Sequence, residues 1–107
     1  MQRGEIITVA MAGDYGKPRP AVVIQTDRVG ITDTILVCLI SSDLQDLPSI
    51  RIDVPATTGT GLERPSQIMV EKIFAVVKVK CRKRIGLIDA ETQGVLNEAL
   101  FMMIGLD

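Results

Sequence analysis

Short apolar runs, separated by polar segments that contain glycine or proline, make up most of this chain. Residues 21–24 and 35–40 are continuous apolar runs, which predict strands that are covered on both faces. Residues 50–54 alternate apolar and charged side chains, as a half-exposed strand does. The predicted strands are 5–9, 21–25, 34–40, 50–54, 66–72, 73–80 and 83–88. Short strands with mostly short connections predict a mainly β fold, a small SH3-like antiparallel barrel.

The last part of the sequence has helical periodicity instead. Asp89 suits an N-cap and Gly105 a C-cap, and apolar residues recur between them at helical spacing. Residues 99–104 are apolar on every side of this predicted helix. One small barrel covers only one face of a helix, so we expect a second copy of the chain to cover the other face in a homodimer. Coverage by loops is the alternative.

Composition limits the classes of function. A chain of 107 residues forms one domain, residues 1–107. It has one tyrosine, two phenylalanines and no tryptophan, so binding of single strands by base stacking on aromatic side chains is not expected. The 12 basic and 13 acidic residues nearly cancel, so affinity for nucleic acid must come from a local patch.

The sequence contains no histidine, which excludes histidine acid–base catalysis and a Ser-His-Asp triad. Cys38 and Cys81 lack the spacing of metal ligands, and the carboxylates form no metal-binding motif, so we expect neither a metal nor a cofactor. Two distant cysteines predict reduced thiols and a cytoplasmic protein. We find no signal-peptide pattern and no apolar run of membrane-spanning length, and expect no membrane partner.

Residues 17–25 are the first candidate for a functional site. Pro18 and Pro20 each fix their own φ and restrict the residue before them, so the backbone of Arg19 has little freedom. A guanidinium is thereby held at the start of a rigid core strand, which is a typical position for a functional side chain. From composition alone, an ordinary turn into a core strand is the simpler interpretation.

Positive charge concentrates near the end of the strand region. The cluster consists of Lys78, Lys80, Arg82, Lys83 and Arg84. The first three alternate along the sequence, which predicts that they share one strand face. Such a face favours either a groove that follows a phosphate backbone or an edge strand that lysines protect against aggregation.

Several stretches, in a fixed order, resemble the MazF/PemK family of toxins, which are small ribonucleases of toxin–antitoxin systems. The stretches are Arg3-Gly4-Glu5-Ile6, residues 19–25 with Arg19-Pro20, Ile40-Ser41-Ser42, residues 61–66, Glu71-Lys72-Ile73, residues 84–88 and residues 96–100. Each motif is weak alone, but the ordered set extends over the whole chain and is specific.

The resemblance implies a fold that is shared with gyrase-poisoning toxins, so the fold alone does not identify the target. It implies a homodimeric endoribonuclease that cuts single-stranded RNA without a metal and leaves 2′,3′-cyclic phosphate and 5′-hydroxyl ends. The ribose 2′-hydroxyl is then the nucleophile, and the protein supplies a proton acceptor, a proton donor and positive charge. The alternatives are a toxin that poisons a protein such as gyrase, and a degenerate member that only pairs with an antitoxin.

By family position, the resemblance implies that Arg19, Ser41 and Glu71 are catalytic. A guanidinium holds two phosphate oxygens and stays charged, and a serine hydroxyl donates a hydrogen bond to the same phosphate. The alternatives are a turn-forming role for Ser41 and a salt bridge or an exposed strand position for Glu71. Some relatives carry an arginine two positions before the acid, where this chain has Met69.

The RNA contacts that we expect are Lys17, Gln25, Ser42, Lys72, Lys78 and Lys80. The loops 11–17 and 55–65 would determine which RNA sequence is cut. The family antitoxin is acidic and partly disordered, and such a chain suits a basic groove. We therefore expect a cognate antitoxin as the protein partner.

Overall fold

The computed structural model describes residues 1–11 and 17–107. The elements are β1 (Glu5–Val9), β2 (Arg19–Val23), β3 (Thr34–Ser41), β4 (Arg51–Val54), β5 (Ser66–Val77), the 3₁₀ helix η1 (Lys78–Lys80), β6 (Cys81–Leu87) and α1 (Ala90–Ile104). Most of the loop 11–17, to which the sequence assigns a role in RNA specificity, lies outside the described residues.

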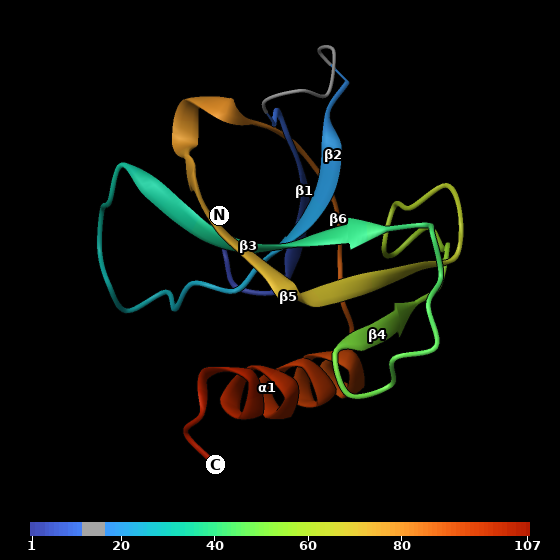
Figure 1. Ribbon diagram of the computed structural model, residues 1–107. Coiled ribbons are helices and arrows are strands. Elements are labelled where there is room, and N and C mark those ends of the chain that lie inside the picture. Colours follow the sequence, from blue (N-terminus) through green and yellow to red (C-terminus); the bar gives the residue numbers. More distant parts are fainter. Residues whose placement is uncertain (12–16) are drawn as a thin grey trace.

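All six strands form one antiparallel sheet in the order β4-β5-β3-β2-β1-β6. The sheet curls strongly, and α1 lies below it, against β4 and β5 (Figure 1). This arrangement confirms the mainly β class, the antiparallel pairing and the C-terminal helix that the sequence predicts.

The central strands bury apolar side chains on both faces of the sheet. On one face, Ile6, Val22 and Cys38 pack in a cluster with the buried side of α1. On the other face, Ile7 and Ala21 belong to a second cluster. Because both faces are covered, these strands have continuous apolar sequences rather than alternating ones, as predicted.

Cys38 and Cys81 are free thiols. Burial raises the pKa of Cys38 to about 12, so this thiol stays protonated at neutral pH. Burial also raises the pKa of the half-buried Cys81. Neither thiol has the low pKa of a reactive nucleophile.

The sheet differs from the prediction after residue 65. The predicted strands 66–72 and 73–80 are a single strand, β5, which a register shift against β3 divides. The 3₁₀ helix η1 then precedes β6. The prediction that Lys78, Lys80 and Arg82 alternate along one strand face is therefore wrong, because a 3₁₀ turn interrupts the two-residue period of a strand.

The helix α1 has the predicted caps. The Asp89 carboxylate accepts a hydrogen bond from the backbone N–H of Thr92 at 2.8 Å, and this bond lowers the pKa of Asp89. Gly105 ends the helix with a φ of 82°, and its N–H donates to the carbonyl of Met102. This left-handed conformation carries little steric cost only in glycine.

Only one stripe of α1 is covered. The buried residues of the helix are Leu96, Ala99 and Leu100. Phe101 and Ile104 are 51% and 60% exposed, so an apolar face of the helix is open to solvent in the single chain. Of the helices in the described part of the chain, none is both long enough and apolar enough to cross a membrane.

Candidate active site

The start of β2 and the end of β3 lie side by side in the sheet. The ladder between these strands pairs Ala21 with Leu39. Continuing the same antiparallel register by two residues brings Arg19 opposite Ser41. The two main catalytic candidates are thus placed on neighbouring strand ends.

A cleft of about 490 Å³ opens over these strand ends. Arg19, Ser41 and Ser42 all line it, and Pro18 and Pro20 line it on either side of the arginine. Arg19 is half-buried at the first position of β2, where it pairs with Val9 of β1. The cleft therefore brings together, next to open solvent, a guanidinium on a fixed backbone and two hydroxyl groups.

The Ser41 hydroxyl also has a turn-forming role. Its Oγ accepts a hydrogen bond from the backbone N–H of Asp43 at 3.0 Å. A serine that accepts one bond still has its own O–H to donate. The turn thus fixes the Ser41 side chain and leaves a donor for a phosphate oxygen in the cleft.

Another part of the cleft lining comes from the loop before β5. Its residues Glu63 and Arg64 line the cleft, and they add a carboxylate and a second guanidinium. Neither residue is among the catalytic or RNA-binding residues expected from the sequence, although both lie in the loop 55–65 that was expected to influence RNA specificity. The available signal was the dipeptide Arg64-Pro65, which repeats Arg19-Pro20 and restricts the arginine in the same way.

Hydrogen bonds fix this loop against β6. The buried Thr60 donates from its hydroxyl to the carbonyl of Pro55 at 2.7 Å. The carbonyl of Gly59 accepts from the backbone N–H of Leu87 at 2.9 Å. The loop is thus joined both to its own start and to the edge of the sheet.

Two glycines allow the loop backbone to approach β6 closely. Gly61 has a φ of +71°, and a Cβ at this position would lie 2.0 Å from the carbonyl oxygen of Ile85. A Cβ on Gly86 would lie 2.2 Å from the carbonyl group of Thr60. Both distances are far below van der Waals contact, so a side chain at either position would displace the wall that carries Glu63.

Glu71 lies outside this cleft. Arg51 of β4 donates hydrogen bonds to its carboxylate at 2.6 and 3.0 Å. These bonds lower the pKa of Glu71, which weakens it as a proton acceptor. The structure thus shows the salt bridge that was the alternative for Glu71. Some relatives carry an arginine at the position of Met69. In this chain, Arg51 pairs with Met69 in the β4–β5 ladder, so the neighbouring strand supplies the guanidinium beside Glu71.

Of the RNA contacts expected from the sequence, Ser42 alone is among the described residues that line the Arg19 cleft. Gln25 lies beyond the other end of β2, about 20 Å from Arg19 at the rise of a strand. Its side-chain amide donates to the Thr32 hydroxyl and accepts from the backbone N–H of Leu36 in β3, and Gln25 lines a separate cavity with Lys78. The remaining candidates, Lys17, Lys72 and Lys80, are exposed but do not line the cleft.

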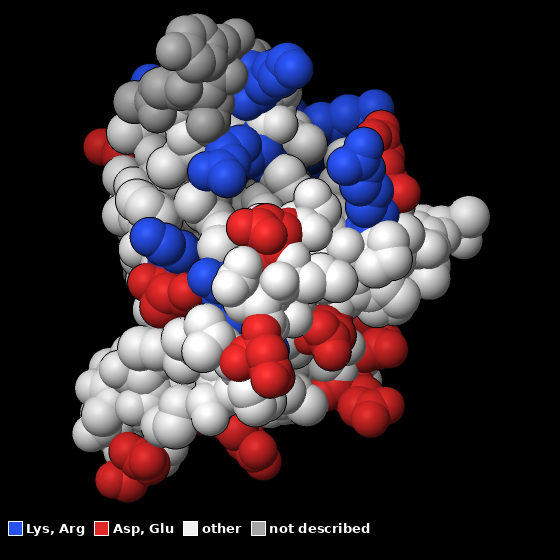
Figure 2. Space-filling view, turned by 45° about the vertical axis from the view of Figure 1, so that its right-hand side comes forward, with Lys and Arg blue, Asp and Glu red and all other residues white. Residues whose placement is uncertain are grey.

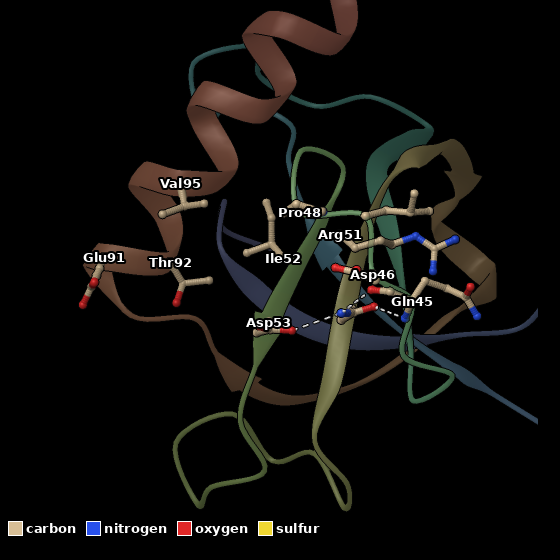
Figure 3. A pocket seen from close by; sticks show the side chains of 11 residues that line it. Gln45, Asp46, Pro48, Arg51, Ile52, Asp53, Glu91, Thr92 and Val95 are labelled. Atoms are coloured by element: carbon tan, nitrogen blue, oxygen red, sulfur yellow. Dashed lines mark hydrogen bonds between the residues drawn. The ribbon is translucent and has the colours of Figure 1, made fainter.

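Charge distinguishes the cleft from a polar cavity beside α1. Lys and Arg gather on the upper part of the face in Figure 2, and Asp and Glu gather below, where α1 lies. A second cavity, of about 380 Å³, lies between α1 and β4 (Figure 3), and its lining includes Asp46, Asp53 and Glu91. Its Arg51 is already paired with Glu71. This acidic lining repels a polyanion, so the Arg19 cleft is the better site for nucleic acid.

The described residues contain no group of three or more side chains that could hold a metal ion. Comparison with known proteins then identifies the family. Residues 2–104 match the family described as PemK-like, MazF-like toxin of type II toxin–antitoxin system. The chain belongs to the MazF/PemK family.

Two sequence relatives of this MazF/PemK chain have named activities. A probable endoribonuclease MazF of Mycolicibacterium smegmatis is 37% identical over 108 residues, which cover 99% of this chain and 98% of the relative. Endoribonuclease MazF9 of Mycobacterium tuberculosis is 30% identical over 116 residues, with coverage of 99% and 98%. These relatives confirm the enzyme class that the resemblance implied.

Solved structures confirm the MazF fold. Mycobacterium tuberculosis toxin MazF-mt6 superposes with a TM-score of 0.82 at 21% identity, covering 96% of this chain and 98% of the toxin. A mycobacterial endoribonuclease in complex with its cognate antitoxin gives 0.82 at 15% identity, with coverage of 100% and 97%. A MazE–MazF structure from Deinococcus radiodurans gives 0.79 at 18% identity, with coverage of 98% and 95%.

Proposed function

We propose that this MazF-family toxin cleaves single-stranded RNA in the cleft between Arg19 and Ser41. The ribose 2′-hydroxyl gives up its proton and attacks the adjacent phosphorus, the bond to the 5′-oxygen breaks as that oxygen takes up a proton, and a 2′,3′-cyclic phosphate and a 5′-hydroxyl remain. The observation that supports this proposal is the cleft itself, in which two residues far apart in sequence come together beside solvent. The nucleophile belongs to the substrate, so the protein need only bind the phosphate and move protons.

Arg19 and Ser41 have complementary roles in this proposal. The Arg19 guanidinium binds two phosphate oxygens and stabilises the negative charge that develops in the transition state. The Ser41 hydroxyl donates a hydrogen bond to the same phosphate. Cleavage of a panel of RNAs in EDTA tests the proposal, and we expect cyclic phosphate ends. Toxicity in cells without RNA cleavage would instead support a protein target.

The acceptor for the 2′-hydroxyl proton is tested by one substitution at two positions. Glu63 lines the cleft, whereas Glu71 lies outside it and is bound to Arg51. We expect Glu63→Gln to lower kcat about 100-fold, the lower end for loss of a general base, and Glu71→Gln to change kcat less than tenfold. Single-turnover cleavage measures both. The reverse order of effects would restore Glu71 as the acceptor.

Glu71→Gln is expected to change stability instead. Arg51 lowers the pKa of the Glu71 carboxyl in the folded protein. The stabilisation from this pair is therefore complete above the unfolded pKa and is lost as the pH falls through the lower folded value. We expect a loss of about 1–2 kcal/mol at pH 7 that shrinks below about pH 4. Urea unfolding of both proteins at pH 7 and pH 3 measures it, and an equal difference at both values would contradict the expectation.

The open face of α1 supports a homodimer. Phe101, Met102 and Ile104 are exposed in the single chain, although the helix buries its other stripe. Covering these side chains with the same face of a second copy removes apolar surface from water. Sedimentation tests the proposal, since a dimer has twice the 11.6 kDa mass of the chain.

We also propose a cognate antitoxin as a partner. The similar solved structures include an endoribonuclease in complex with its cognate antitoxin and MazE–MazF structures. The basic side chains that gather on the upper part of the face in Figure 2 suit an acidic antitoxin segment. If that segment covers the cleft, the antitoxin is expected to block access of RNA to Arg19.

A further inference from the structure

We infer that Arg64 binds a second phosphate of the RNA, next to the phosphate at which Arg19 acts. The two guanidinium groups, one on the loop before β5 and one at the start of β2, would then hold the RNA backbone together. This inference rests on the proposed function, because it assumes that RNA occupies the cleft.

Arg64 lies where it can contact the RNA that Arg19 binds. Arg64 and Arg19 line the same cleft, one on the loop before β5 and the other at the start of β2. Arg64 is exposed, and the ion pairs of Arg51 and Arg84 do not include it. An exposed guanidinium on a cleft wall can bind phosphate with two parallel hydrogen bonds.

The backbone of Arg64 is held in place. The Ser66 hydroxyl donates to the carbonyl of Arg64 at 2.8 Å, and Pro65 restricts the conformation of the arginine before it. The loop that leads to Arg64 is fixed on β6 by the close contacts at Gly61 and Gly86. A wall that is already ordered loses little conformational entropy when RNA binds.

Arg64 also adds positive charge to the cleft. Among the described residues that line the cleft, Arg19, Arg64 and Glu63 are charged, and together they carry a formal charge of +1. Arg64 supplies one of the two positive charges in this group, and every nucleotide of the substrate brings another phosphate. Phosphate contacts supply most of the sequence-independent affinity for nucleic acid. Arg64 is therefore expected to act on binding, and Arg19 on the chemical step.

Binding of an RNA that cannot react tests this assignment. The probe is a set of 2′-O-methyl RNA oligonucleotides of mixed sequence, which lack the attacking hydroxyl, titrated at several salt concentrations. We expect Arg64→Gln to raise Kd about tenfold and to reduce the slope of log K against log salt by about 0.7, the value for one phosphate on a single strand. Cleavage of ordinary RNA at saturating concentration should keep its kcat within about threefold.

Arg28→Gln is the matched control. Arg28 is also an exposed arginine, but it lies in the connection beyond the other end of β2. The Arg28→Gln protein should bind the oligonucleotides as tightly as the wild type does. Equal melting temperatures of the two variants would show that both fold, as expected for exposed positions.

The results separate this inference from the proposed nuclease. The inference would be overturned if Arg64→Gln kept the wild-type Kd and salt slope, or if the wild type did not bind the oligonucleotides. Neither result would contradict the proposed nuclease, which the cleavage assay tests separately. A loss of affinity for only one base sequence would also overturn it, because that result identifies a base contact. Binding that depends on Arg64, in a wild-type protein that cuts no RNA, would support the inference and contradict the nuclease.

Discussion

Arg19→Ala is expected to lower kcat for RNA cleavage about 1,000-fold, in the range for loss of a transition-state arginine. The half-buried Arg19 lies at the first position of β2 and lines the cleft with Ser41, so its loss removes positive charge from the proposed site of reaction. Arg19→Lys should recover only part of the rate, because an ammonium group cannot form the two parallel bonds of a guanidinium. Single-turnover cleavage in EDTA measures both variants.

Arg28→Ala is the control for this prediction, since it removes the same charge at the other end of β2. Its kcat should equal that of the wild type. Full activity in Arg19→Ala, with the fold intact by thermal unfolding, would remove Arg19 from the reaction. Equal losses in the two variants would show that total charge matters and the position of the charge does not.

The same substitution at two glycines is expected to change stability in opposite directions. A Cβ on Gly86 would lie 2.2 Å from the carbonyl group of Thr60, so Gly86→Ala should lower the free energy of unfolding by about 3 kcal/mol, the upper end for overpacking. No atom lies within 4 Å of a Cβ on Gly94, in the interior of α1. Gly94→Ala should raise the free energy of unfolding by about 1 kcal/mol.

Urea unfolding at one fixed protein concentration measures both effects, because the stability of a dimer depends on concentration. Gly86→Ala should also reduce RNA cleavage, since the loop that it displaces carries Glu63 and Arg64. If Gly86→Ala kept wild-type stability and activity, the close contact between the loop and β6 would not be required for the site.

Local sequence patterns predicted most of the elements of the fold. The run Ala21–Ile24 predicted a buried strand because both of its faces are covered, and the Asp89 and Gly105 caps fixed the limits of α1. The sequence divides residues 66–80 into two strands, whereas residues 66–77 form the single strand β5, because β5 continues through a register shift that depends on its pairing with β3. The 3₁₀ helix η1 was not predicted either, because its lysines alternate along the sequence as they would in a strand.

The candidate site was only partly predictable from the sequence. The restricted backbone of Arg19 and the family motifs identified two residues that do line one cleft. Gln25 belongs to the same motif as Arg19, but it lies beyond the opposite end of β2. The partner of Glu71 comes from β4, and the position of Arg64 depends on glycine contacts with β6. These are contacts between distant segments, which no local pattern encodes.

The central claim is that this cleft promotes attack by the substrate's own 2′-hydroxyl. The most direct measurement uses an RNA that the protein cuts at a known bond, with a single 2′-deoxy nucleotide before that bond, in EDTA. We predict that cleavage at this bond disappears, and that the unmodified RNA gives 2′,3′-cyclic phosphate and 5′-hydroxyl ends. Cleavage of the deoxy substrate at the same bond, or a 5′-phosphate on the product, would contradict the account.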